Sequence, residues 1–290
     1  MNDAQVIEIL VCIKVIILGL VSIGTLIYTI PICFHRKLRT PLNLLSVNVS
    51  LTLFICTMFW GIYLVISTWF DNILWTKKSC LWILYLQAAV NCLSIYSTCI
   101  ASLNRLLAIV YHTTVLFRTT KWILMCIVVQ WIIAILISLP TFTSSLKHCL
   151  ISGLEIYQQL YVLFIAACLP SIFLSITNIS IFLHVRRSTQ RIYSAHNEVN
   201  GTSLIISQRD IRLLKHMIFM FSIFFCSWVP IYIIAVINWN GTGITYLAYH
   251  ILQFLPAIGF VTNIIDLFLY NHELRAYFFQ KFRENPISST

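Results

Sequence analysis

Seven long apolar blocks, separated by short polar stretches, constrain the fold of this chain more than any other feature of its sequence. The blocks cover about residues 6–33, 42–69, 79–111, 122–141, 156–184, 213–238 and 244–270. A helix needs about 20 apolar residues to cross the hydrocarbon layer of a bilayer, and every block reaches that length. The backbone polar groups of a span must be satisfied within lipid, which favours helices. The sequence therefore predicts an all-α integral membrane protein, a seven-transmembrane helix bundle that forms one domain over residues 1–290.

The composition excludes the two main alternatives to a membrane protein. Hydrophobic residues make up 59% of the chain and charged residues only 10%, with a mean hydropathy of +0.88. Soluble domains average about 45–50% apolar and about 25% charged residues, so a soluble fold of this chain would expose apolar side chains over most of its surface. The 14% aromatic content and the scarcity of charge also exclude a disordered chain.

A short amphipathic segment follows the seventh block. Between residues 272 and 283, four apolar side chains lie on one side of a helix: Leu274, Tyr277, Phe278 and Phe282. A segment of this kind lies along the membrane surface rather than across it. We therefore expect a short amphipathic eighth helix over residues 272–283.

The distribution of lysine and arginine orients the predicted bundle. If the amino terminus is extracellular, 15 of the 19 lysines and arginines fall on the cytoplasmic side and three fall in extracellular connectors. Cationic residues concentrate on the cytoplasmic side of membrane proteins, so we expect an extracellular amino terminus and a cytoplasmic carboxy terminus. Anionic membrane lipids beside a basic inner face then explain the net charge of +10 without a nucleic-acid partner. The remaining cation, Lys14, lies within the first block.

Two of the ten cysteines stand apart because they lie at block edges next to polar residues. In the expected orientation, Cys80 and Cys149 both face the oxidising extracellular space, where they could form a disulfide; two free thiols are the alternative. The other eight cysteines lie in apolar blocks and are expected to pack as small hydrophobic residues. No cysteine spacing typical of a zinc site occurs, and we expect neither a metal nor a cofactor.

Several sequence elements occur in order along the blocks. They are Arg36 to Leu45 followed by Asn48, Arg105 at 25 residues after Cys80, Trp131 with Pro140, Pro170, Phe224 to Pro230, and Tyr270 to Phe278. In order and spacing these elements resemble those of class A (rhodopsin-like) G-protein-coupled receptors, and they cover nearly the whole chain. The resemblance implies a plasma-membrane receptor, not an enzyme, that binds an extracellular ligand and activates a heterotrimeric G protein.

The resemblance assigns roles in switching and G-protein coupling to residues of the third, sixth and seventh blocks. These residues are Arg105, Asp210, Phe224, Trp228, Pro230, Asp266 and Tyr270. In the family, the arginine that Arg105 matches holds the sixth helix inward at rest and meets the G protein in the active state. Because Asn104 replaces the usual neighbouring acid, we expect Arg105 to pair with Asp210; pairing of Asp210 with nearby arginines or lipid is the alternative. Pro230 is expected to kink the sixth helix and make a hinge.

Asp266 is a carboxylate within an otherwise apolar block, which is costly unless it is partnered or protonated. The family's sodium site uses a second-span aspartate, whose place is taken here by Leu53. A neutral, hydrogen-bonded Asp266 is therefore favoured over a sodium site.

Four side chains are expected from their positions to line the ligand cavity: Gln87, Asn91, Trp228 and Tyr232. Amine receptors of the family carry an aspartate where this chain has Gln87, so a peptide or a small neutral molecule is favoured over an amine. The seventh block also lacks the lysine to which retinal binds in opsins. Each of the four side chains could instead make ordinary contacts between helices.

Two rival classes remain beside a signalling receptor. Transporters usually show internal repeats and paired broken helices, and the two halves of this chain show no repeat. The altered third-span and seventh-span elements also allow a degenerate receptor that folds without signalling. Sequence motifs of zinc proteases, serine hydrolases and phosphate-binding loops are absent, which disfavours an enzyme.

Overall fold

The computed structural model describes residues 3–70, 77–110, 115–143, 156–195, 203–237 and 245–284. Side chains are described for fewer residues, and those of residues 185–217 are outside the described part. All regular structure within these ranges is helical. Seven helical segments are long and apolar enough to cross a membrane: Gln5–Phe34, Pro41–Trp69, Ser79–Ala108, Thr120–Phe142, Ile156–His184, Ile218–Ile237 and Leu247–Tyr270. The predicted seven-helix bundle is thus confirmed.

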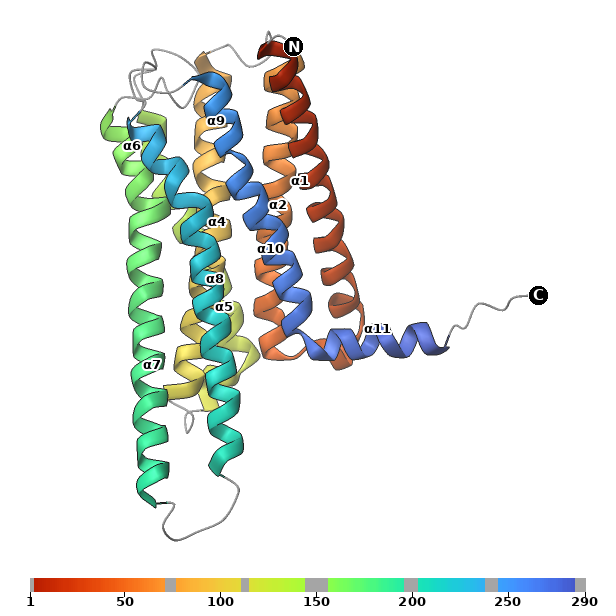
Figure 1. Ribbon diagram of the computed structural model, residues 1–290, viewed down its shortest axis with the longest axis vertical. Coiled ribbons are helices and arrows are strands. Elements are labelled where there is room, and N and C mark those ends of the chain that lie inside the picture. Colours follow the sequence, from red (N-terminus) through yellow and green to blue (C-terminus); the bar gives the residue numbers. More distant parts are fainter. Residues whose placement is uncertain are drawn as a thin grey trace, which may run out of the picture.

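The helices run along the long axis of the bundle, and the N terminus lies at the end opposite to α11 (Figure 1). The α-helices are α1 (Asp3–Phe34), α2 (Pro41–Trp69), α4 (Lys77–Val110), α5 (Thr120–Ser138), α6 (Ile156–Leu163), α7 (Leu169–Ala195), α8 (Ser203–Ile237), α9 (Tyr246–Leu252), α10 (Phe254–Tyr270) and α11 (His272–Glu284). We call the two ends of the bundle the N-terminal end and the α11 end.

The third span, in α4, lies in the interior of the bundle. Two thirds (67%) of its most apolar stretch is buried, whereas the same measure is 22% for the spans of α5 and α8. The exposed side chains of α5 are largely aliphatic and include Leu124, Val128, Ile132 and Leu136. An apolar outer surface of this kind fits a lipid environment.

Buried polar side chains join α2, α4 and α5. Asn48 donates its Nδ2 hydrogen to Oε1 of Gln130 (2.8 Å), and Nε1 of Trp131 donates to Oδ1 of Asn48 (3.0 Å). Gln130 in turn donates to the backbone carbonyl of Leu93 (3.0 Å). Since polar side chains inside membrane proteins favour partners on neighbouring helices, this network fixes the relative positions of the three helices.

The fifth span contains a π-helical turn, η5 (Phe164–Cys168), between α6 and α7. Pro170 follows this turn and has no backbone N–H to donate to the preceding turn. The hydroxyl of Tyr96 donates to the carbonyl of Ile165 at 2.9 Å. A side chain of α4 thereby satisfies a carbonyl at the point where the helical hydrogen-bond pattern changes.

The seventh span is two helices rather than the single helix expected over residues 244–270. α9 ends at Leu252 and α10 begins at Phe254. Proline removes a backbone donor and its ring clashes with the carbonyl four residues earlier, which for Pro256 is the carbonyl of Leu252. Pro256 therefore breaks the span instead of only kinking it, and Gln253 lies at the break.

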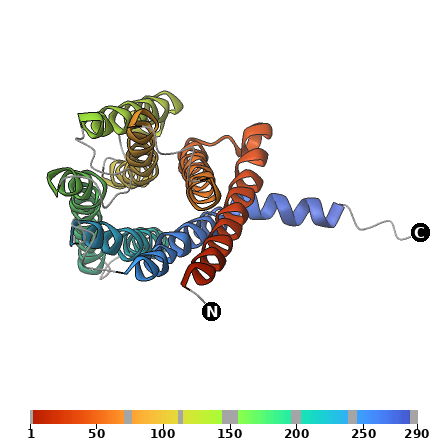
Figure 2. The ribbon, with the colours of Figure 1, turned by 90° about the horizontal axis from the view of Figure 1, so that it is seen from above.

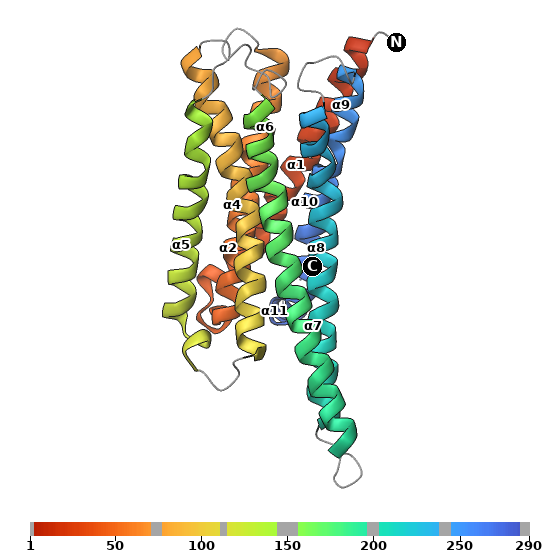
Figure 3. The same ribbon diagram turned by 90° about the vertical axis from the view of Figure 1, so that its left-hand side faces the viewer.

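Residues 185–212 separate the fifth and sixth apolar blocks, and much of this connector is helical. α7 continues to Ala195, and α8 already begins at Ser203. The two helices extend side by side beyond the rest of the bundle at the α11 end (Figure 3). Loss of apolar character marks the end of the membrane span, and these helices continue past it.

α11 confirms the expected amphipathic eighth helix, and it projects sideways from the bundle (Figure 2). Leu274 is fully buried, whereas Phe279 is exposed. Asn43 of α2 donates to Oε2 of Glu273 at 2.8 Å, and the hydroxyl of Tyr277 lies 2.6 Å from Nε2 of His35. The first turns of α11 are thereby attached to the chain around the connection between α1 and α2.

Candidate functional site

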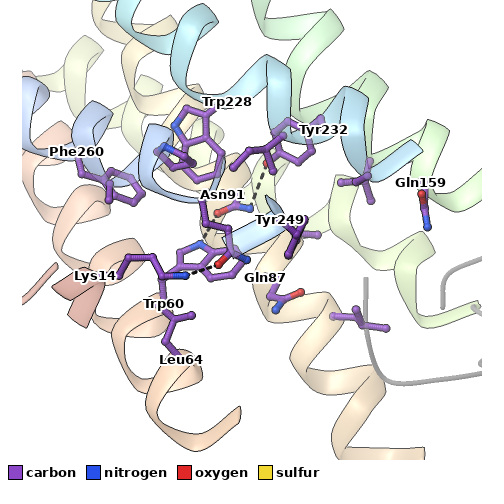
Figure 4. A pocket seen from close by; sticks show the side chains of 18 of the residues that line it. Lys14, Trp60, Leu64, Gln87, Asn91, Gln159, Trp228, Tyr232, Tyr249 and Phe260 are labelled. Carbon is purple, nitrogen blue, oxygen red and sulfur yellow. Dashed lines mark hydrogen bonds between the residues drawn. The ribbon is translucent and has the colours of Figure 1, made fainter. Parts of the chain in front are cut away.

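A cavity of about 110 Å³ lies within the N-terminal half of the bundle (Figure 4). Its walls come from α1, α2, α4, α6, α8, α9 and α10 together with Thr141. A cavity of this size has room for several water molecules or a small organic molecule. Its polar lining residues include Lys14, Gln87, Asn91, Gln158, Gln159, Tyr232, Tyr249 and Gln253.

The structure brings the four predicted ligand-contacting residues into this one cavity. Nδ2 of Asn91 donates to the hydroxyl of Tyr232 at 3.1 Å, and Oδ1 of Asn91 accepts from Nε1 of Trp60 at 2.9 Å. The ring of Trp228 stacks on that of Tyr232 with centroids 6.0 Å apart. Gln87 also lines the cavity and is buried. Asn91 therefore links α2, α4 and α8 across the cavity wall.

Lys14 is a cavity residue that the motif comparison missed. Only 1% of its surface is exposed. Its Nζ donates to Oε1 of Gln253 at 2.7 Å and lies 2.9 Å from Nδ1 of His250. It also lies 5.9 Å from the centre of the Phe254 ring. The signal available in the sequence was the presence of a lysine deep within an apolar block, which is unusual in membrane helices.

Gln158 of α6 is a second cavity residue that sequence reasoning missed. It is 5% exposed, and neither its Oε1 nor its Nε2 atom has a hydrogen-bond partner in the described part of the chain. Nε2 of Gln87 likewise has no partner there. Buried amides are normally hydrogen-bonded, so these two side chains offer donors and an acceptor to a molecule in the cavity.

Towards the α11 end, Arg105 and Asp266 form a second polar site. Arg105 has a favourable electrostatic interaction with Asp266, and Tyr28 and Tyr270 contribute to the same electrostatic environment. Asp266 is 1% exposed. The sequence analysis did not predict this interaction, and the neutral, hydrogen-bonded Asp266 that it favoured stays a prediction. The expected partner Asp210 lies in α8, but its side chain is outside the described residues.

Two further switch residues lie in α8: Phe224 one turn before the cavity-lining Trp228, and Pro230 between Trp228 and the cavity-lining Tyr232. Phe224 is buried in the same core as Trp228, and Pro230 lies within the helix. The ring of Trp228 also meets Phe260 of α10 edge-on, with centroids 5.4 Å apart. Movement of Trp228 would therefore disturb the packing between α8 and α10.

Gly259 allows α8 and α10 to approach closely beside this aromatic contact. A Cβ atom added at Gly259 would lie 2.5 Å from Oγ and 2.8 Å from Cβ of Ser227. Small residues allow such close approach between membrane helices. Steric fit at this point couples the positions of the two helices.

Cys80 takes part in a disulfide, whereas the other cysteines of the described residues are free. Its expected partner, Cys149, lies outside the described residues. Cys80 is buried near the start of α4 at the N-terminal end of the bundle.

The similarity of the chain to known proteins identifies its family. The model of the family 7 transmembrane receptor (rhodopsin family) matches residues 24–270. The chain belongs to this family. No curated protein matches the chain. The receptor is therefore a multi-pass membrane protein of the class that the sequence elements indicated, and family membership speaks against a transporter or channel.

Proposed function

We propose that this receptor resides in the plasma membrane, binds an extracellular ligand in the cavity and activates a heterotrimeric G protein at the α11 end. The observation that carries the proposal is the course of α8. Trp228 and Tyr232 of this helix line the cavity, and the same helix extends beyond the opposite end of the bundle. A change in packing around Trp228 at the cavity can therefore alter the position of the α11 end of the same helix.

The proposed orientation follows from the distribution of cations. Lysine and arginine are concentrated in the connectors and the tail at the α11 end, so that end is assigned to the cytoplasm and the N-terminal end to the outside. In this orientation the cavity lies in the extracellular half of the bundle. A disulfide between Cys80 and Cys149 would then tie the connector after α5 to the start of α4.

Activation is proposed to be a shift between two populations of the bundle. Pro230 removes a backbone hydrogen bond from α8 and creates a position where the helix can bend. A ligand that contacts Trp228 and fits better when α8 is displaced outward would favour that state. Loss of the Arg105–Asp266 interaction would free Arg105 to meet the G protein.

The experiment combines topology and signalling in intact cells. Epitope tags at the two ends should be accessible from outside only at the amino terminus. The receptor, expressed with promiscuous G proteins and exposed to peptide and small-molecule libraries, should give a response that Arg105→Ala abolishes at equal surface expression. Lys121→Ala is the matched control, because Lys121 is an exposed cation of the first turn of α5. A response that survives Arg105→Ala would contradict the proposed coupling site.

A receptor that folds without signalling is the second candidate. The observations that favour it are the altered third-span element, where Asn104 replaces the family's acid, and the altered seventh-span element that begins at Asp266. Ligand-dependent stabilisation of the purified receptor, together with silence in every G-protein channel, would support this second candidate.

A further inference from the structure

The cavity contains a buried cation, Lys14, that has no carboxylate partner among the described residues. The complete set of polar contacts of Lys14 within the described residues consists of His250 and Gln253, and neither carries a negative charge that could neutralise an ammonium group. Glu8, six residues earlier in α1, is exposed. A charge inside a membrane protein is costly unless an opposite charge or a water-filled space compensates it.

Lys14 does not behave as a lysine that reaches for lipid headgroups. Lysines near the membrane surface extend their ammonium group into water while the alkyl chain stays in lipid. The side chain of Lys14 is instead 1% exposed and lies against the cavity (Figure 4). The ammonium group is therefore held inside the bundle.

Two hydrogen bonds to described residues hold the ammonium group of Lys14 in place, and they leave one of its donors. An ammonium group has three N–H donors and no acceptor. One hydrogen goes to Oε1 of Gln253 and one to Nδ1 of His250, which must accept because the ammonium group can only donate. Gln253 is available for this role because the break before Pro256 places it between α9 and α10.

We infer that the cavity binds a small organic monoanion, a carboxylate, whose negative charge pairs with the third donor of Lys14. The inference rests on the proposed function, since it takes the cavity to be the ligand site. Lys14 is the single cation among the lining residues that the structure describes, and no aspartate or glutamate is among them. One positive charge matches one carboxylate. It does not match a phosphate dianion, whose recognition usually uses several cationic or backbone donors.

The other lining residues indicate the chemistry of the remainder of such a ligand. Trp60, Leu64, Val162 and Phe260 contribute apolar and aromatic surface. Nε2 of Gln87 and both amide atoms of Gln158 are uncharged groups that lack hydrogen-bond partners in the described structure. Figure 4 shows Gln159 on the far side of the cavity from Lys14, with Asn91 and Tyr232 between them. The ligand is thus an acid with an apolar body and, at its other end, an uncharged group that forms hydrogen bonds.

The test measures binding directly and does not require signalling. The purified receptor is mixed with phenylacetate, hydrocinnamate, phenylbutyrate, hexanoate or octanoate, and each acid is compared with its primary amide and with the amine of the same carbon skeleton. The readout is the shift in thermal unfolding temperature as a function of ligand concentration. At least one acid should stabilise the receptor at lower concentration than its amide and its amine.

Variants of Lys14 then show whether this residue causes the preference for acids over amides and amines. Lys14→Met removes the charge, Lys14→Gln removes the charge but keeps an N–H donor, and Lys14→Arg keeps the charge. Since a hydrogen bond to a charged group is worth about 1.5–3 kcal/mol, the first two should weaken binding of the acid by about tenfold or more. Binding of the amide should change little in Lys14→Gln. Lys121→Met controls for a general loss of positive charge.

The outcomes distinguish the inference about Lys14 from the proposed signalling function. Equal stabilisation by acids and amides, an acid preference that persists in both uncharged variants, or no stabilisation by any acid overturns the inference. If acids bind through Lys14 while no G protein responds, the inference stands and the proposed signalling fails. If a ligand signals through Arg105 but is insensitive to Lys14→Gln, the proposed function stands and the inference fails.

Discussion

Lys14 is buried and Arg105 is partly buried, and the surroundings of these two cations of the bundle differ in one respect. Arg105 interacts electrostatically with the carboxylate of Asp266 on α10. The described hydrogen-bond partners of Lys14 are the uncharged acceptors of His250 and Gln253. The bundle thus compensates the charge near the α11 end from within. At the N-terminal end it leaves the charge facing a cavity, where an external molecule can compensate it.

The largest effect is expected from separating the internal pair. Asp266→Leu removes a carboxylate that is 1% exposed and leaves the partly buried Arg105 without this electrostatic interaction. Removing one partner of a fully buried pair costs about 3–5 kcal/mol, which is the upper bound for the loss here. The unfolding temperature of the purified receptor should fall strongly, and the double variant Arg105→Met with Asp266→Leu should recover much of the loss. Glu8→Leu, which changes an exposed carboxylate, is the control. A small effect of Asp266→Leu would show that the pair contributes little to stability.

A smaller effect is expected at the contact that lies between the two sites. Gly259→Ala places a methyl group against Ser227, and overpacking of this kind costs about 1–3 kcal/mol. Ser227→Gly should relieve the clash when it is combined with Gly259→Ala. Thermal unfolding of the single and double variants checks the prediction. Gly19→Ala serves as the matched control, because an added Cβ there meets no atom within 4 Å. Additive effects of the two substitutions would contradict the proposed contact.

The smallest effect is expected from Lys14→Met in the receptor without ligand. Replacing a buried, uncompensated charge with an apolar side chain of similar length is often neutral or stabilising. Loss of the contacts with His250 and Gln253 offsets part of this gain. The unfolding temperature should therefore stay within a few degrees of the wild-type value, in contrast to Asp266→Leu. A large drop would place Lys14 in the structural framework and would remove the difference between the two cations.

The sequence predicted the seven spans because their length and apolar character are local properties. It did not predict the break at Gln253 or the π-helical turn before Pro170. How a proline is accommodated depends on partners from other helices, as the contact of Tyr96 with Ile165 shows. The helical parts of residues 185–212 were missed because the apolar signal ends where the membrane ends and the helices continue.

Part of the candidate site could also be predicted from the sequence, and part could not. Gln87, Asn91, Trp228 and Tyr232 could be placed from the order of the family's sequence elements, and the structure brings them into one cavity. Lys14 could not be placed, because its partner His250 lies 236 residues away in the chain. The interaction of Arg105 with Asp266 also joins distant helices. The pairing of Arg105 with Asp210 stays a prediction, because the side chain of Asp210 lies outside the described residues.

The attachment of α11 has a consequence for how the bundle can change shape. Its hydrogen bonds through Glu273 and Tyr277 reach Asn43 and His35, around the connection between α1 and α2, and none of these bonds involves α8. If α8 moves outward, we expect α11 to keep its position relative to α1 and α2. A cytosolic protein that binds between α11 and α8 would then contact one helix that stays in place and one that moves. The distance between these two helices would depend on whether a ligand occupies the cavity.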